Sequence, residues 1–222
     1  MLGTIINAAV IVIASITGIL LGSRFNETLK IALIQALGLV VLLIGVSMAL
    51  KTENILILTA SILLGTAIGE TMKIENWLER AGARIERKFK GSKFAEGFVS
   101  STLLFCVGSM AFVGSIQEGL TGDATILLTK SMLDGVAAIA LSSTLGIGVM
   151  FSSISVLIYQ GFFTLLASFI SPYMTQHVVA EITATGGLLI MAIGLKLLEV
   201  KNLKVGNMLP ALLVAPVLAY FF

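Results

Sequence analysis

Long apolar blocks alternate with short polar segments along the whole chain, and this pattern predicts its secondary structure. A helix of about 18 to 22 apolar residues spans the roughly 30 Å of hydrocarbon in a bilayer, whereas a closed β-barrel would show short alternating strands. We therefore predict an all-α polytopic membrane protein with about eight transmembrane helices. They occupy residues 4–22, 31–50, 55–72, 98–116, 126–146, 149–170, 179–197 and 206–222.

The composition supports a membrane location. Of the 222 residues, 57% are hydrophobic and 12% are charged, whereas a soluble domain carries roughly 25% charged residues. We expect one transmembrane domain over residues 1–222. Its first apolar block lacks the basic head and the cleavage site of a secretion signal, so we expect this block to remain as a membrane helix.

Few residues of this chain suit catalysis or metal binding. The single cysteine excludes an intrachain disulfide, and the single histidine excludes a multi-histidine metal site; both counts come from the full sequence. The only aspartates are Asp123 and Asp134, and an aspartyl protease would need both within the membrane, whereas Asp123 is expected in a loop. We therefore expect neither an enzyme nor a cofactor.

The one long polar segment is "KIENWLERAGARIERKFKGSK", residues 73–93, which carries seven Lys and Arg residues. Its apolar residues recur at helical spacing, which predicts an amphipathic helix in the headgroup layer. Basic segments of this kind stay in the cytoplasm, so the N-terminus is expected outside. A topology anchor explains every residue of the segment, and we expect no nucleic-acid partner.

Two stretches of the chain resemble each other. "ALGLVVLLIGVSM" at 36–48 matches "TGGLLIMAIGLKL" at 185–197, with Gly38 opposite Gly187 and Gly45 opposite Gly194. The match predicts a repeat of helices 1–3 in helices 6–8. Since the copies are an odd number of helices apart, they lie in opposite directions across the membrane. Inverted repeats are the architecture of many secondary transporters, and channels use them as well.

The motifs "LGTIINAAVIVIASITGILLGS", "QALGLVVLLIG", "VGSIQEGLTGD", "LLTKSMLDG" and "LSSTLGIGV" resemble the bacterial membrane proteins of domain of unknown function family 554, the YdfK-like proteins. The resemblance covers essentially the whole chain. It implies a multi-helix protein of the bacterial plasma (inner) membrane. It implies no substrate and no site residues, so these must come from the residues themselves.

Candidate site residues gather in the middle of the chain. "VGSMAFVGS" places Gly108 and Ser109 six residues before Gly114 and Ser115. Gly–Ser pairs are positions at which helices kink, and a kink at membrane depth exposes backbone groups that could contact a solute. Close helix packing through small residues explains the same pattern, and the sequence alone leaves both readings open.

Two charged residues, Lys130 and Asp134, lie inside the apolar block 126–146, four residues apart and therefore on one helix face. An ionisable residue within a span costs about 2.5–3.5 kcal/mol on insertion scales and usually faces the protein interior or a cavity. The pair is predicted to contribute to a solute site, although a purely structural ion pair explains it too. Asn7 and Gln160, in matching helices of the repeat, are further candidate contacts.

The motif "SIQEGLTGD" is expected to form a loop, with Glu118 and Asp123 as solvated charges and Gly119 and Gly122 as turn residues. The alternative is an outer mouth at which the two acids attract cations.

Close helix packing explains the glycine pairs Gly18–Gly22 and Gly65–Gly69. Pro210 and Pro216 are expected to bend or interrupt the last helix.

These observations favour a secondary transporter of a small ion or zwitterionic metabolite. Protonation of Asp134, or a cation bound beside it, could couple the transport. The first alternative is an ion channel with the same fold, and the second is a membrane scaffold or sensor that transports nothing. The expected partners are the solute and the lipid bilayer, and the sequence leaves the oligomeric state open, a homo-oligomer included.

Overall fold

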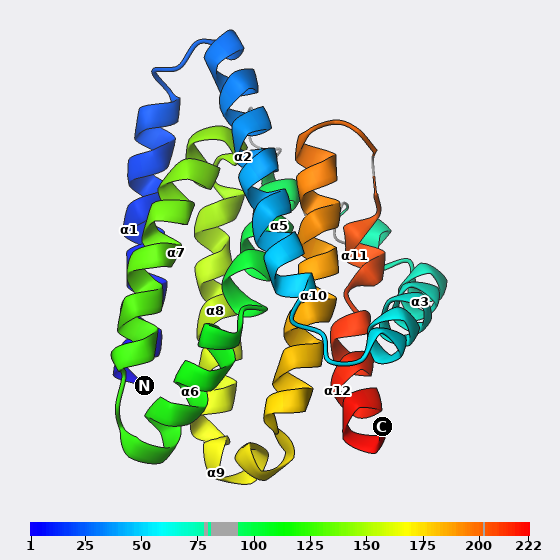
Figure 1. Ribbon diagram of the computed structural model, residues 1–222. Helices are drawn as coiled ribbons and strands as arrows, with labels where there is room; N and C mark the ends of the chain where they lie inside the picture. The colour runs from blue at the N-terminus through cyan, green and yellow to red at the C-terminus, as the bar shows by residue number, and fades with distance from the viewer. Residues whose placement is uncertain (78–79, 81–92, 202) are drawn as a thin grey trace. The chain divides into compact units, whose positions relative to one another are not determined.

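The computed structural model describes residues 1–77, 80, 93–201 and 203–222, and every regular element in these ranges is a helix (Figure 1). The elements are α1 (Leu2–Gly22), α2 (Glu27–Ala49), α3 (Ile55–Met72), α5 (Phe94–Cys106), α6 (Ser109–Thr121), α7 (Thr125–Leu145), α8 (Gly148–Leu165), α9 (Ala167–Ile170), the 3₁₀ helix η1 (Ser171–Tyr173), α10 (Gln176–Leu197), α11 (Val205–Met208) and α12 (Ala211–Phe221).

Six helices among the described residues are long and apolar enough to cross a bilayer, namely α1, α2 from Ile31, α3, α7, α8 and α10. Each coincides with a predicted apolar block. In lipid, a block of about 20 apolar residues is stable as a helix because its backbone N–H and C=O groups then hydrogen-bond to one another. The prediction of eight spans is not confirmed. Counting α5 and α6 as one bent span brings the total to seven.

The fourth predicted block is broken rather than continuous. α5 ends at Cys106 and α6 begins at Ser109, and the two axes differ by 56°. Gly108 precedes α6 with an extended backbone, φ −62° and ψ 143°, which stops the helical hydrogen bonding between them. The last predicted block is also interrupted, as expected, at Pro210, which lacks an N–H donor and separates α11 from α12. Pro216 lies inside α12 and does not interrupt it.

The helices form two compact units, which are described separately. Unit 1 comprises residues 1–33 and 82–172, and unit 2 comprises residues 34–81 and 173–222. The prediction of a single transmembrane domain stays a prediction. Of the basic segment 73–93, residues 78–79 and 81–92 fall outside the described residues, so the predicted amphipathic helix stays a prediction.

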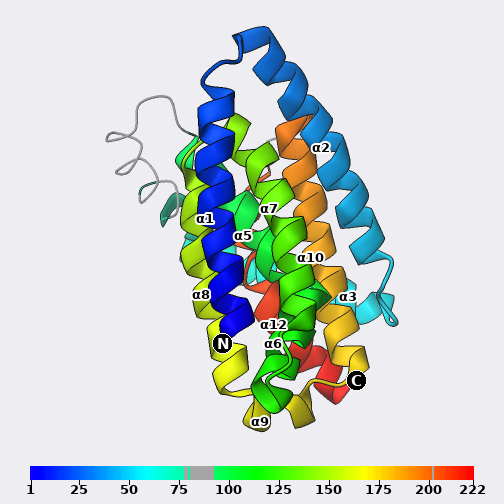
Figure 2. The ribbon, with the colours of Figure 1, turned by 90° about the vertical axis from the view of Figure 1, so that its left-hand side faces the viewer.

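In unit 1, α1 packs along α7 and α8, and α8 also packs on α5 (Figure 2). Small residues allow the close approach of α1 and α7. A Cβ atom on Gly18 would lie 2.3 Å from the carbonyl oxygen of Ile139, and one on Gly22 would lie 2.1 Å from that of Ser143. The prediction that Gly18 and Gly22 serve helix packing is therefore confirmed.

In unit 2, α2 and α10 pack through four glycines. A Cβ atom on Gly194 would lie 3.0 Å from the carbonyl oxygen of Gly38, and one on Gly187 would lie 2.7 Å from that of Gly45. These contacts pair the two helices in opposite directions.

The second predicted glycine pair also packs closely. Cβ atoms on Gly65 and Gly69 of α3 would meet the backbone of Ala211 and Asn207 at 2.3 Å and 2.0 Å. A small core in unit 2 joins Ile57, Val178 and Ala219.

Candidate functional site

Most of the buried polar side chains in the described residues belong to unit 1, on the facing sides of α1, α5, α6, α7 and α8. Many serines among them donate to a carbonyl oxygen of their own helix, as Ser115 does to Ala111 (2.6 Å) and Ser131 to Leu127 (2.7 Å). Helix packing accounts for such hydroxyls. The charged and amide side chains are different, because they contact other helices or have no partner.

Lys130, Asp134 and Asn7 meet in the interior of unit 1. Lys130 and Asp134 are 4% and 7% exposed, and Asn7 is fully buried. The ammonium of Lys130 bonds to Oδ2 of Asp134, and Nδ2 of Asn7 donates to the same oxygen over 3.0 Å. One carboxylate oxygen thus receives two donors from two helices, while Oδ1 of Asn7 has no hydrogen-bond partner among the described residues.

The helix break lies close to this group. Nζ of Lys130 is 5.9 Å from the ring centroid of Phe105, which is three residues before Gly108. The carbonyl end of α5 and the amide end of α6 lie on either side of Gly108, and such helix ends carry partial charges of opposite sign. Beside Gly108 there is open space, since a Cβ atom there would meet nothing within 4 Å.

The other predicted residues of "VGSMAFVGS" lie away from that space. Gly114 packs against α7, with a Cβ atom there 2.8 Å from Cδ2 of Leu127, and Ser115 bonds within α6. This placement fits the packing alternative for Gly114 and Ser115. The side chain of Ser109 is outside the described part of the structure.

Glu118 is not a loop residue, and that prediction was wrong. It lies in α6 at 4% exposure, where its Oε1 accepts the N–H of Gly3 over 2.7 Å and its Oε2 the hydroxyl of Thr4 over 3.4 Å. The α-amino group of Met1 lies 3.1 Å from Oε1. A carboxylate here satisfies the free amides at the start of α1. Gly119 likewise lies inside α6 rather than in a turn.

The rest of that motif does form a loop. Gly122 ends α6 with φ 75°, and Asp123 follows it on the surface. Asp123 accepts the hydroxyl of Thr125 (2.6 Å), the N–H of Thr125 (2.9 Å) and the side-chain amide of Gln117 (2.6 Å). These hydrogen bonds, first of all the one from the Thr125 hydroxyl, hold the pKa of Asp123 below its ordinary value.

Gln160 of α8 is fully buried, and within the described part of the chain neither its Oε1 nor its Nε2 has a hydrogen-bond partner. The hydroxyl of Thr164, one turn further along α8, also has no partner there. A buried amide without partners costs free energy unless water or a ligand satisfies it. Gln160 therefore stays a candidate contact.

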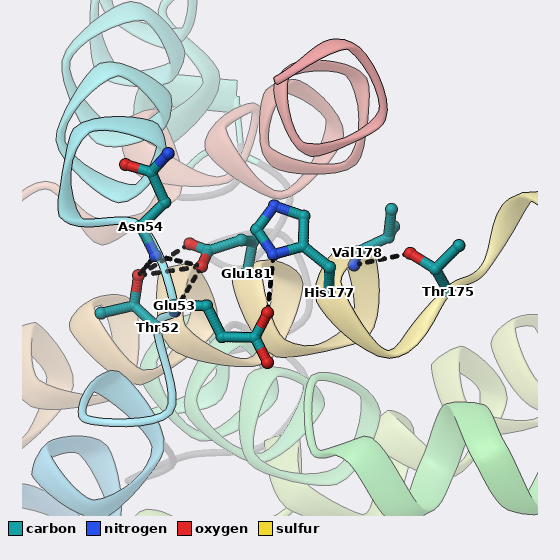
Figure 3. A network of polar contacts seen from close by, with 7 residues as sticks. All are labelled: Thr52, Glu53, Asn54, Thr175, His177, Val178 and Glu181. Atoms are coloured by element: carbon teal, nitrogen blue, oxygen red, sulfur yellow. Dashed lines mark hydrogen bonds and ion pairs between the residues drawn. The ribbon is translucent and has the colours of Figure 1, made fainter.

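Unit 2 holds a second buried carboxylate network, centred on Glu181 of α10 (Figure 3). Its Oε1 accepts the N–H groups of Glu53 (2.7 Å) and Asn54 (2.9 Å), and the hydroxyl of Thr52 reaches both carboxylate oxygens. Nδ1 of His177 lies 2.8 Å from Oε2 of Glu53. Glu181 thus fixes the turn before α3, a structural role that its position in an apolar block alone did not reveal.

Within the described residues, no three His, Cys, Asp or Glu side chains gather as a metal site would require. The polar interior of unit 1 suits hydrogen bonding and charge pairing instead. Apolar helices around an interior of this kind define a helical membrane protein.

The chain belongs to the family described as "Protein of unknown function (DUF554)", whose model matches residues 2–220. The uncharacterized protein YqgA of Escherichia coli (strain K12) is 35% identical over 221 residues, which cover 96% of this chain and 94% of that protein. The uncharacterized membrane protein YdfK of Bacillus subtilis (strain 168) is 32% identical over 224 residues, 99% and 96% of the two chains. No solved structure matches significantly.

Proposed function

We propose that this protein is a secondary transporter of a small ion or zwitterionic metabolite, and that its solute site is formed by Lys130, Asp134 and Asn7 beside the break at Gly108. The observation that carries the proposal is the conjunction of a buried acid and base with a broken helix in one unit. Transporters place their solutes at helix breaks of this kind, where free amides and carbonyls are available.

The chemistry of the site favours a solute with both signs of charge, or an ion that replaces one member of the pair. Asp134 offers a carboxylate and Lys130 an ammonium, so a bound zwitterion could exchange one internal ion pair for two ion pairs with itself. Because the internal pair is already neutral, neither charge is left uncompensated when no solute is bound. Protonation of Asp134 would weaken its bond to Lys130 and is the proposed route for coupling.

The glycines of unit 2 support the inverted repeat. The repeat exchanges Gly38 with Gly187 and Gly45 with Gly194. A two-fold operation that performs this exchange turns the contact between Gly38 and Gly194 into the contact between Gly45 and Gly187, and both contacts are present. An antiparallel pair with such internal symmetry is what an inverted repeat requires.

We further propose a multi-pass arrangement in the bacterial inner membrane, with the N-terminus outside and segment 73–93 in the cytoplasm. The distribution of Lys and Arg among the loops supports this orientation.

Uptake of labelled ions, amino acids and organic acids by proteoliposomes tests the proposal, because uptake also detects a zwitterion that carries no net charge. We expect saturable uptake of one solute class, lost in Lys130→Met/Asp134→Leu and retained in Asp123→Asn, which changes an exposed carboxylate. Gly108→Ala should reduce the uptake without loss of stability, because its φ and ψ suit alanine and the added methyl enters open space. Equal uptake by the wild type and the double variant would remove the site.

The same break favours one alternative, an ion channel that uses α5 and α6 as a filter. Ion currents that persist in planar bilayers and do not saturate like a carrier would favour it over the transporter.

A further inference from the structure

Unit 2 contains an apolar groove between the start of α10 and the end of α12. The groove has a volume of about 230 Å³. Its lining includes Val178, Pro216, Val217, Phe221 and the rings of Tyr173 and Tyr220. In the part of the chain that the structure describes, no charged side chain lines it. A dry apolar cavity of about 150 Å³ admits a molecule the size of benzene, so the groove has room for a longer piece of hydrocarbon.

The two tyrosines indicate where the groove lies in the membrane. α10 is long and apolar enough to cross a bilayer from its first residue, Gln176, and Tyr173 precedes it by three residues. The rings of Tyr173 and Tyr220 lie 6.0 Å apart, and both residues are more than half exposed. Tyrosine gathers at the boundary between headgroups and hydrocarbon, because its ring is apolar and its hydroxyl is polar. The groove therefore begins at headgroup level and extends into the hydrocarbon.

An exposed apolar stripe continues from the groove along α12. Leu213, Val217 and Phe221 follow one another at intervals of four residues, so they share a helix face, and they are 75%, 56% and 73% exposed. The 11 residues of α12 rise by about 16 Å, which is close to half of the roughly 30 Å hydrocarbon core. The groove is thus continuous with the surface that faces lipid, and groove and stripe together match the depth of one leaflet.

We propose that this groove is a phospholipid site, in which one acyl chain lies between α10 and α12 and continues along Val217 and Leu213 towards the middle of the bilayer. The inference rests on the membrane location of these helices and not on transport. Lipid tails are as apolar as the groove, so the hydrophobic effect does not favour this position over the rest of the bilayer. The gain comes from van der Waals contacts, because a chain in the groove touches protein on two sides.

The lining of the groove predicts that the acyl chain, rather than the headgroup, determines binding. Arg and Lys are the side chains that hold phosphate strongly, and neither lines the groove in the described part of the chain. The hydroxyls of Tyr173 and Tyr220 are able to donate to phosphate or ester oxygens, which all glycerophospholipids have in common. Phosphatidylethanolamine and phosphatidylglycerol should therefore bind with similar affinity, although only the second carries a net charge.

Native mass spectrometry of the full chain in detergent tests the site. Delipidated protein is titrated with dioleoylphosphatidylethanolamine and, separately, with dioleoylphosphatidylglycerol. Val217→Trp places a large side chain in the groove and should exclude the acyl chain. Val40→Trp is the matched control, because Val40 of α2 is 53% exposed, close to the 56% of Val217, and does not line the groove.

We expect the wild type and Val40→Trp to bind one phospholipid per chain more than Val217→Trp does, with similar affinity for the two headgroups. Equal binding by all three proteins would overturn the proposal, and so would a severalfold preference for one headgroup. A wild-type dimer that Val217→Trp dissociates would overturn it as well, because a second copy of the chain would then cover the groove.

Thermal unfolding shows whether Val217→Trp folds. If it does not, Phe221→Ala replaces it, since Phe221 is 73% exposed and its ring forms part of the lining. Removing this ring takes away part of one wall without opening the core, so the affinity for phospholipid should fall. Unchanged affinity in Phe221→Ala would then overturn the site.

Discussion

Replacing the buried ion pair of unit 1 one member at a time should destabilise the protein far more than replacing both together. Lys130→Met leaves Asp134, 7% exposed, with Asn7 as its one remaining partner among the described residues. Removing one partner of a buried pair costs about 3–5 kcal/mol, whereas an apolar pair of similar volume is often neutral or stabilising. Asp134→Leu should therefore cost about 3–5 kcal/mol alone, and Lys130→Met/Asp134→Leu should recover most of that loss.

Thermal unfolding of the purified protein in detergent measures this cycle. A loss of about 3–5 kcal/mol corresponds to a fall in Tm of roughly 6–20 °C for a chain of this length. Lys51→Met is the control, because it makes the same change as Lys130→Met at an exposed lysine. If either single variant unfolds within the error of that control, the pair is not buried as described. If the double variant is as unstable as the two losses added, the two residues do not act as a pair.

Three further changes test other contacts. Gly22→Ala should lower the free energy of unfolding by about 1–3 kcal/mol, because the new Cβ would lie 2.1 Å from the carbonyl oxygen of Ser143. An unchanged Tm would mean that α1 and α7 are further apart than the structure shows. Glu181→Gln should lower the free energy of unfolding by about 1–3 kcal/mol. Oε1 of Glu181 accepts the amides of Glu53 and Asn54, and glutamine offers them either an uncharged oxygen or an NH₂ group that cannot accept. Unchanged hydrogen exchange at these two amides would contradict this role. The native pKa of Asp123 lies below its ordinary value, so its contribution to stability is present above about pH 4 and is lost as the pH falls through the native pKa. The difference in Tm between the wild type and Asp123→Asn should shrink over that range. A constant difference would argue against the hydrogen bonds to Thr125.

Helix positions were predictable wherever lipid dictates them. An apolar block of about 20 residues has one stable conformation in a bilayer, so the bounds of α1, α3, α7 and α10 agree with the predicted blocks within a few residues. The break at Gly108 could be anticipated as an alternative, but composition cannot decide it. Both sides of the break are apolar, and a glycine inside a helix is tolerated when a neighbour packs on it, as happens at Gly114.

Contacts within the candidate site were predictable where they join residues close together in the sequence. Lys130 and Asp134 lie four residues apart on one helix, so their pairing follows from helical geometry. Asn7 meets Asp134 across 127 residues of sequence, and no local pattern indicates such a contact. Glu118 was misassigned because its neighbours Gly119 and Gly122 resemble turn residues, although only Gly122 ends a helix.

A thermal-shift ligand screen on the wild type and on Lys130→Met/Asp134→Leu tests the proposed solute site most directly, with ions, amino acids, organic acids and small sugars as ligands. A ligand that binds only the folded state adds about 2.7 kcal/mol of stability at a hundred times its Kd. We predict that one chemical class stabilises the wild type and that the double variant, although folded, does not respond. A stabilising solute that acts equally on both proteins would contradict a site at Lys130 and Asp134 and leave them as a structural ion pair.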